Sequence, residues 1–250
     1  MAQQVDFATR YAKTSGWQRE RGQELMAMAA PRQGESVLDI GCGTGGLTAQ
    51  LARRVGAAGK VVGVDPDAAR VALARSALPA DLHNLQFVEG RGESMPWITG
   101  GSVDLAFSNF VLHWVPNKPA VVRETMRCLR PGGRLAFQVG GNYPDVLAEA
   151  TDAAASGEDR RIASLAFLSA EEWGALLRRE GFVSVRTRAV DSAVSFASAE
   201  AFYDWWEGTS HGAFRRQAVR PQRRDTFEAS FAQGRIATFR NVQIVAAKPH

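Results

Sequence analysis

The sequence predicts an α/β protein built on a single, mostly parallel sheet of seven strands, with helices on both faces. Three observations indicate this class. Short apolar runs alternate with helical patterns along most of the chain. A glycine-rich turn joins the first apolar run to the first of these helices. The last two runs have no helix-sized pattern between them that would force them to be parallel, so the last strand is expected to be antiparallel.

Apolar runs bounded by turn residues give the seven expected strands. They lie at residues 36–40, 60–64, 85–88, 103–107, 134–139, 182–190 and 241–247. Helices are expected between them, at residues 45–55, 66–77, 118–129 and from 170 onward.

Local signals mark the ends of two of these helices. Asp65 stands before Pro66, and it is expected to cap the helix that follows the second strand. Ser169 and Glu172 have the spacing of a capping box, and Gly181 closes the helix that they start.

Composition is that of an ordinary globular chain. The 250 residues are 45% hydrophobic and 22% charged, with a net charge of +4. No apolar run approaches the roughly 20 residues that span a bilayer, and the N-terminus lacks the pattern of a signal peptide. Two isolated cysteines, Cys42 and Cys128, form neither a disulfide framework nor a metal site. We therefore expect a cytoplasmic protein without a metal or a membrane partner.

Positive charge gathers near the C-terminus. The arginines there are Arg215, Arg216, Arg220, Arg223, Arg224, Arg235 and Arg240. They lack the interleaved aromatic residues that stack on bases, so no nucleic-acid partner is expected. Most are expected to be solvated, and one or two to bind an acidic small molecule.

The most informative motif is Val37-Leu38-Asp39-Ile40-Gly41-Cys42-Gly43-Thr44-Gly45-Gly46. It runs from an apolar strand into a glycine turn and then into a helix. Glycines let the backbone approach a ligand, and the helix N-terminus offers free N–H groups. Asp65 ends the next strand, where a carboxylate can accept hydrogen bonds from ribose hydroxyls. The motif predicts a site for a cofactor that carries a nucleoside.

Two cofactors fit the turn. Gly41, Gly43 and Gly46 match the dinucleotide fingerprint G-x-G-x-x-G. However, Asp39 would repel a pyrophosphate and attract a sulfonium and an ammonium. With this acid the motif resembles the first motif of class I S-adenosylmethionine-dependent methyltransferases. The resemblance implies a Rossmann-like sheet and S-adenosylmethionine as cofactor.

The same resemblance assigns cofactor-binding residues. Asp39 and the turn residues Gly41, Cys42, Gly43 and Gly45 are expected at the methionine end. Asp65, with Pro66, is expected at the ribose.

Relatives usually carry an aspartate after the third strand that accepts from the adenine amino group. Arg91 stands there in this chain and cannot accept a hydrogen bond. Gly92, Glu93 or stacking on Arg91 is therefore expected to read adenine.

The end of the fourth strand resembles the Asn-x-x-Leu-x-Trp segment of the trans-aconitate and malonyl carrier-protein O-methyltransferase type. Asn109 is expected to bind the amino-acid end of the cofactor, and Trp114 to face the substrate. His113 is a candidate general base or, alternatively, a packed histidine.

Aromatic residues outside the core complete the candidate site. Tyr11 and Trp17 stand where relatives place aromatics over the cofactor, although both could serve packing. Trp205 and Trp206 resemble the Trp-x-x-Gly-Thr segment of the same relatives and are expected to line the substrate pocket. Arg240 opens the last strand and is the leading candidate for a substrate counter-ion.

We expect residues 1–250 to form one methyltransferase domain. Its cofactor-binding core is expected at 33–140, after an N-terminal helical arm at 1–30. Residues 191–238 are rich in aromatics and are expected to form a helical cap or lid over the edge of the sheet where ligands bind.

These residues predict a methyltransferase that acts on a small molecule, as a monomer or a homodimer. A carboxylate acceptor needs no base, so methylation of a carboxylic acid on oxygen is the preferred hypothesis. The substrate would then be anionic, with cap arginines as its counter-ions. A phenol, carbon or nitrogen acceptor remains an alternative. So do a nicotinamide-dependent oxidoreductase and a non-catalytic cofactor-binding module.

Overall fold

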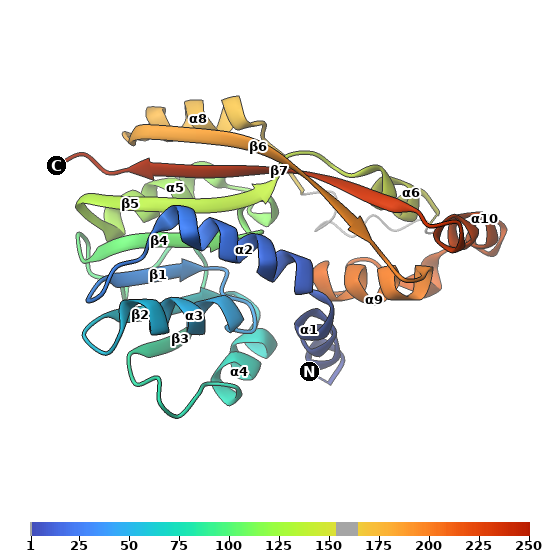
Figure 1. The fold of residues 1–250 in the computed structure, drawn as a ribbon, viewed down its shortest axis with the longest axis horizontal. Coiled ribbons are helices and arrows are strands. Elements are labelled where there is room, and N and C mark those ends of the chain that lie inside the picture. The colour runs from blue at the N-terminus through green and yellow to red at the C-terminus, as the bar shows by residue number, and fades with distance from the viewer. Residues whose placement is uncertain (1, 154–164) are drawn as a thin grey trace.

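The computed structural model describes residues 2–153 and 165–250. Alternating strands and helices are followed by a region in which two long strands enclose further helices (Figure 1). In chain order the elements are α1 (Ala2–Thr14), α2 (Gly16–Ala29), β1 (Ser36–Ile40), α3 (Gly46–Val55), β2 (Lys60–Asp65), α4 (Ala68–Ser76), β3 (Leu85–Glu89), β4 (Val103–Asn109), η1 (Leu112–Trp114), α5 (Lys118–Cys128), β5 (Leu129–Gly140), α6 (Asp145–Ala153), α8 (Ala170–Arg179), β6 (Val183–Ser195), α9 (Ala199–Thr209), η2 (Arg216–Ala218), α10 (Pro221–Ala232) and β7 (Ile236–Ala247).

The strands form one seven-stranded sheet in the order β3-β2-β1-β4-β5-β7-β6. β7 pairs antiparallel with both of its neighbours, and the other pairs are parallel, which confirms the predicted fold class. Ile40 pairs with Val64, and Asp39 pairs with Phe107. The carboxyl ends of β1, β2 and β4 therefore meet at one edge of the sheet, where ligands bind in such folds.

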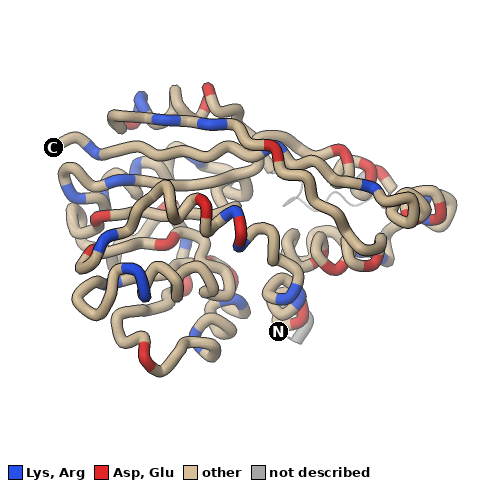
Figure 2. Tube along the Cα trace, in the orientation of Figure 1, with Lys and Arg blue, Asp and Glu red and all other residues tan. Residues whose placement is uncertain are grey.

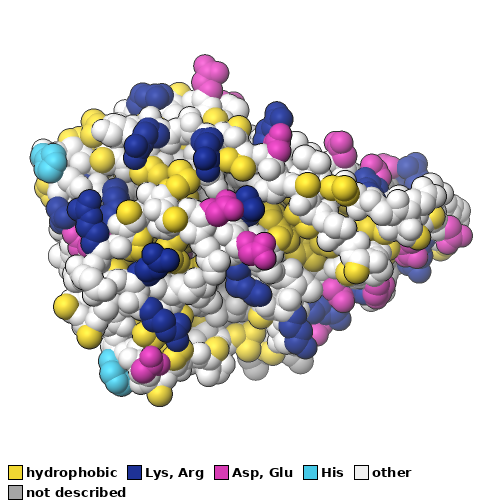
Figure 3. Space-filling view, in the orientation of Figure 1, with side chains coloured by type: hydrophobic (Ala, Val, Ile, Leu, Met, Phe, Trp, Pro, Cys, Tyr) yellow, Lys and Arg dark blue, Asp and Glu magenta, His cyan; other side chains and the backbone are white. Residues whose placement is uncertain are grey.

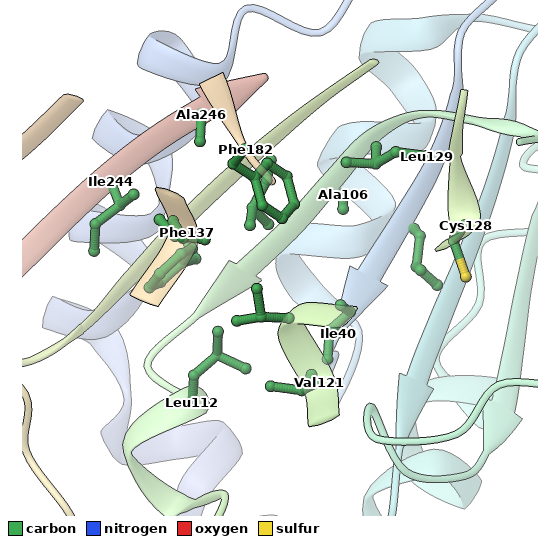
Figure 4. Packing of buried hydrophobic residues seen from close by; sticks show 14 of the residues in the cluster. Ile40, Ala106, Leu112, Val121, Cys128, Leu129, Phe137, Phe182, Ile244 and Ala246 are labelled. Carbon is green, nitrogen blue, oxygen red and sulfur yellow. The ribbon is translucent and has the colours of Figure 1, made fainter. Parts of the chain in front are cut away.

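Helices cover both faces of the sheet. Apolar residues of α2, α3 and α4 pack on one face, and those of α5 and α8 pack on the other. Figure 4 shows the second side, where Ile40 of β1 lies near Val121 of α5, and Phe137 of β5 lies towards Ile244 of β7. Trp173 of α8 is fully buried there and meets the Phe137 ring edge-on, 4.9 Å between centroids. Burial of both faces explains why these strands are continuous apolar runs.

The cap consists of α6, α9, α10 and the outer parts of β6 and β7, which share a third apolar cluster. It extends from the sheet towards the right of Figure 1. β6 continues to Ser195 and β7 starts at Ile236, so both strands run further into the 191–238 segment than the sequence predicts. Polar and apolar residues alternate there because only one side of the ribbon packs on the cap helices. Helix α1 packs along α9 and so connects the N-terminus to the cap.

Both acidic and basic residues recur along the elements of the cap (Figure 2). Between the cap and the sheet, apolar side chains gather in a recessed part of the visible face (Figure 3). Within the described residues, no helix is long and apolar enough to cross a bilayer.

Candidate active site

The glycine turn after β1 adopts a backbone that glycine alone accommodates. Gly41 and Gly45 have φ of 76° and 81°. A Cβ at Gly41 would lie 2.2 Å from the Val111 side chain, and one at Gly45 would lie 2.5 Å from the Phe87 ring. The turn is thus fixed by its neighbours and exposes backbone N–H groups at the start of α3.

Asp65 holds this turn in place. Its carboxylate accepts hydrogen bonds from the Gly43 N–H and the Asp67 N–H, each at 2.9 Å. The expectation that Asp65 caps the next helix was wrong. Asp67 is the cap, because it accepts from the N–H groups of the first turn of α4 and the helix begins only at Ala68. Asp65 and Pro66 both line the main cavity, where the carboxylate has lone pairs left for a ribose.

Asp39 lines a small pocket beside the turn. It is buried and accepts a 2.7 Å hydrogen bond from Thr48 Oγ1. Burial raises the pKa of Asp39 to about 7, against the lowering effect of the Thr48 hydrogen bond. Arg19 of α2 lines the same pocket, together with Cys42 and Tyr11. The carboxyl group of Asp39 and the guanidinium of Arg19 in one small pocket suit an amino acid, which carries an ammonium and a carboxylate.

The segment after β3 forms another part of the main cavity wall. Gly92 and Glu93 line it. A Cβ at Gly92 would approach Ile40 and Val121 within 2.9 Å, so the backbone there must pass close to β1 and α5. The Arg91 side chain is exposed and lies 3.4 Å from Glu93.

Asn109 lines both pockets, but its side chain is already used inside the protein. Its amide donates to the Gln18 carbonyl of α2, and its oxygen accepts from Gln138 of β5. Gln243 of β7 in turn donates to Gln138 at 2.7 Å. This polar chain fixes α2 against the sheet, so Asn109 is suited to shape the site as well as to contact a ligand.

The two aromatic residues of the arm have different surroundings. Tyr11 lines both pockets and carries the Arg70 guanidinium over its ring at 4.2 Å. Trp17 lines only the main cavity, and its ring lies 5.0 Å from Phe239 and 6.0 Å from Trp205. Tyr11 therefore stands over the glycine turn, whereas Trp17 belongs to the aromatic wall of the cap.

The main cavity has a volume of about 170 Å³ and joins the sheet edge to the cap. One half is formed by the predicted cofactor residues at the ends of β1, β2, β3 and β4. The other half is formed by η1, the residues after β5, α9 and the outer part of β7. A cofactor at the sheet edge and a substrate under the cap would therefore share one space.

His113 lies in the second half, buried and stacked on Phe167. The Gly140 N–H points to its Nδ1 at 3.4 Å. Burial, with a smaller effect of the Lys118 charge, lowers the pKa of His113 to about 3. A neutral ring that accepts at Nδ1 carries its proton on Nε2, so His113 is a donor in this arrangement.

Trp114, Trp205 and Trp206 also line this half. Trp114 and Trp206 have ring centroids 6.0 Å apart, and Trp205 stacks on Trp206 at 5.7 Å. Arg240 contributes to the wall, but its exposed guanidinium pairs with Asp191 of β6, with the closest contact at 2.9 Å. All four residues that the sequence analysis expects at the substrate thus line this cavity.

Sequence reasoning missed several residues of the site. Arg70 is buried, lines the cavity and donates to the Gly208 carbonyl of α9 at 2.8 Å. His211 lines it too, with Nδ1 2.8 Å from Asp67. Phe110 has a left-handed backbone, φ 58°, which a non-glycine residue adopts at a cost. No local pattern could have found these contacts, since each partner is distant in sequence or set by backbone geometry.

Comparisons with known proteins agree with this geometry. Residues 38–137 match the family described as a methyltransferase domain. A trans-aconitate 2-methyltransferase of Deinococcus radiodurans is 32% identical over 197 residues, covering 75% of this chain and 73% of the relative. A nocamycin O-methyltransferase of Saccharothrix syringae is 31% identical, covering 90% of this chain and 86% of the relative.

Solved structures share the fold at low identity. The YcgJ protein of Bacillus subtilis has a TM-score of 0.65 at 19% identity, covering 92% of this chain and 99% of that one. Phosphoethanolamine N-methyltransferase 2 of Haemonchus contortus, in complex with S-adenosyl-L-methionine, has a TM-score of 0.66 at 17% identity, covering 97% and 57%. The family match decides between the two cofactors that the glycine turn allows. The chain belongs to the class I S-adenosylmethionine-dependent methyltransferases, and S-adenosylmethionine is its cofactor.

Proposed function

We propose that this enzyme transfers the methyl group of S-adenosylmethionine to a carboxylate oxygen of a small-molecule acid. The observation that carries the proposal is the state of His113. Its Nδ1 faces the Gly140 N–H at 3.4 Å, and its pKa of about 3 keeps the ring neutral with the proton on Nε2. The histidine beside the expected methyl-transfer position is thus a poor base and a good donor. A carboxylate fits, because it is ionised at neutral pH and needs no base.

Several residues of the cofactor half support binding of S-adenosylmethionine, although Arg91 replaces the usual acid at the adenine position. Asp39 and Arg19 share the small pocket, where they would hold the ammonium and the carboxylate of the amino-acid end. Asp65 would accept from the ribose hydroxyls while it keeps the glycine turn in place. Gly92 and Glu93 would border the adenine. When bound, the cofactor supplies an electrophilic methyl group on a sulfonium.

The protein then has two tasks, which are alignment and exclusion of water. The thioether that leaves needs no proton, so neither end of an in-line displacement on a carboxylate requires acid–base help. Apolar residues under the cap, among them Leu147, Phe167 and Phe239, line the space next to the cofactor half. Such walls exclude water and allow His113 Nε2–H to donate to one acceptor oxygen.

The relatives support a small-molecule acceptor and include one named for an acid. The trans-aconitate 2-methyltransferase covers most of this chain. Others are named for different acceptors, such as a ubiquinone and menaquinone C-methyltransferase of Hahella chejuensis, 42% identical but over only 42% of this chain.

A second candidate is methylation of a phenol or enol, and one observation favours it. His211 lines the cavity, and its Nδ1 lies 2.8 Å from the Asp67 carboxylate. Burial and the Arg70 charge lower the pKa of His211, against the raising effect of the Asp67 hydrogen bond, so the ring is neutral near pH 7. A neutral histidine that is oriented by an acid can accept the proton of a phenol or enol.

Alkali separates the two candidates. The enzyme would be incubated with methyl-labelled S-adenosylmethionine and a set of small acids and phenols, and the labelled products treated with dilute base. We expect a product that releases labelled methanol, because carboxylic methyl esters hydrolyse in base while aryl ethers and C-methyl groups persist. A base-stable product would favour the phenol, enol or carbon alternative instead.

A further inference from the structure

The charges of the cavity wall restrict the substrate beyond the proposed carboxylate chemistry. The arginines of the wall, within residues 2–153 and 165–250, are Arg70, Arg91 and Arg240. Arg91 faces Glu93 in the cofactor half, and Arg240 pairs with Asp191. Arg70 donates to Gly208, packs on Tyr11 and lies 3.8 Å from Asp67. Each wall arginine thus already has a protein partner.

Of the remaining arginines of the cap, Arg215 lies over the Phe7 ring, and the others contact acids or backbone outside the cavity. Arg216 contacts Glu200, Asp204 and Glu207, and Arg10 of α1 shares the last two. Arg235 pairs with Glu149 of α6 at 2.7 Å. None of these cations lines the cavity as the described residues form it. Their role is to join α1, α6 and α9 into the cap, so they do not supply several positive charges to a substrate.

Among the unpartnered polar atoms of the wall, those of neutral side chains predominate. The exception is Nε of Arg70, which lacks a hydrogen bond within the described parts of the chain although another nitrogen of the same guanidinium donates to Gly208. Eight buried side-chain polar atoms lack a partner among the described residues, and six belong to residues that line this cavity. Those six are Trp17 Nε1, Gln18 Oε1, Arg70 Nε, Trp205 Nε1, Trp206 Nε1 and Thr209 Oγ1. The indole nitrogens only donate, so donors outnumber acceptors. An unmet buried donor is costly, and so many at one cavity favour a ligand that brings acceptor oxygens.

The donors sit in a continuous aromatic surface. We call Trp17, Trp114, Trp205 and Trp206 the tryptophan cluster. Neighbouring centroids are about 6 Å apart, at 6.0, 5.7 and 6.0 Å along the row. These indole N–H groups have almost no exposed surface in the ligand-free protein, so an acceptor oxygen would reach them only when the surrounding side chains shift. The same rings offer apolar faces to the body of that ligand.

We propose that the substrate is an apolar or aromatic monocarboxylate, whose single carboxylate is held by neutral N–H donors of the tryptophan cluster. This inference rests on the proposed carboxylate methylation and narrows it. A tricarboxylate such as trans-aconitate would place further charges against apolar walls whose arginines are occupied, at a large desolvation cost. This enzyme therefore differs in acceptor from the trans-aconitate 2-methyltransferases that it resembles.

A panel of acids tests whether the enzyme prefers substrates with one carboxylate to substrates with several. Cinnamate, phenylacetate and octanoate would be compared with trans-aconitate and citrate in a labelled-methyl assay. We expect the best monocarboxylate to exceed every polycarboxylate at least about tenfold in kcat/KM. A polycarboxylate that is preferred overturns this inference and leaves carboxylate methylation intact. If no acid of either class is methylated while S-adenosylmethionine binds in calorimetry, the carboxylate proposal fails and this inference with it.

Two variants test the donors. Trp205→Phe and Trp206→Phe each remove an indole N–H and keep an aromatic ring. We expect the KM of the acid to rise about tenfold in at least one of them, with the cofactor Kd unchanged. Trp173→Phe is the matched control, because its Nε1 is also buried without a partner but it packs in the sheet core away from the cavity. Equal KM values in all three variants overturn the donor assignment.

Discussion

Asp67, at the start of α4, and His211, just after α9, form a contact that connects the cofactor half of the cavity to the cap. Oδ2 of Asp67 and Nδ1 of His211 are 2.8 Å apart. Asp67 also caps α4, two residues after Asp65, and the neighbouring Arg70 donates to Gly208 at the end of α9. We therefore expect changes at the proposed ribose end of the site to affect the proposed substrate half through these two polar contacts.

Asp67→Ser tests this coupling. Serine still caps a helix, so the free energy of unfolding should change by no more than about 1 kcal/mol. Its side chain is too short to reach His211, so the KM of the acceptor should rise severalfold. Thermal denaturation and steady-state kinetics would measure the two effects. Asp67→Asn, which keeps an acceptor at the same length, is the control, and an equal KM in both variants would argue against the coupling.

The carboxylate of Asp67 should stay ionised throughout the physiological pH range. Burial raises the pKa of Asp67, but the His211 hydrogen bond and the charges of His211 and Arg70 outweigh it and lower the pKa to about 2. A depressed pKa contributes stability that is present above about pH 4 and is lost only as pH falls towards 2.

Asp39 predicts a pH dependence for cofactor binding instead. Burial raises its pKa to about 7 in the free protein, and a bound ammonium requires the ionised form. Below pH 7 the carboxyl must lose a proton before it can hold the cofactor, so affinity should fall about tenfold from pH 8 to pH 6. Calorimetry with S-adenosylmethionine would measure it.

Asp39→Asn is the matched control, because it keeps the size of the side chain and cannot ionise. Its affinity should be at least about tenfold weaker at pH 8, from the loss of a charge-assisted hydrogen bond, and nearly flat between pH 6 and 8. The difference between the two proteins isolates Asp39 from titration of the cofactor itself. A flat profile in the native protein would exclude Asp39 as the group that titrates.

The sheet and its binding edge could be predicted from the sequence because their signals are local. Each core strand is an apolar run, and the glycine turn after β1 indicates a cofactor site. The cap strands were harder. Residues 191–195 and 236–240 contain no apolar run, and their strand structure comes from pairing with each other. Tertiary pairing of this kind leaves no mark in a local pattern.

The chemistry of single residues depended on partners distant in sequence. Asp65 has the position of a helix cap, but its carboxylate accepts a hydrogen bond from the Gly43 N–H, 22 residues earlier. His113 has the position of a base, but the Gly140 N–H, 27 residues later, assigns its proton to Nε2. Residue type and position predicted that these groups line the site. Their roles required the fold.

His113→Gln should therefore change turnover little. The glutamine amide can donate in place of Nε2–H, whereas loss of a general base would cost roughly 10²–10⁴-fold. Because the pKa of about 3 lies below the assay range, the native enzyme should show no step near neutrality that this variant removes. His113→Phe keeps a ring but no donor, and the KM of the acid should rise about tenfold. A large loss of kcat in the glutamine variant would identify His113 as a base.

Arg240→Gln distinguishes the counter-ion that the sequence suggests from the neutral donors that the cavity offers. Arg240 and Asp191 are both well exposed and already paired, and an exposed pair of this kind contributes little. We therefore expect the KM of a monocarboxylate to stay within about twofold of the native value, while Trp206→Phe raises it about tenfold. Asp191→Asn, which releases the guanidinium, should improve the KM of trans-aconitate more than that of cinnamate. If Arg240→Gln alone raises the monocarboxylate KM as much as Trp206→Phe, the arginine leaves Asp191 to bind the substrate, and the acid is recognised by charge.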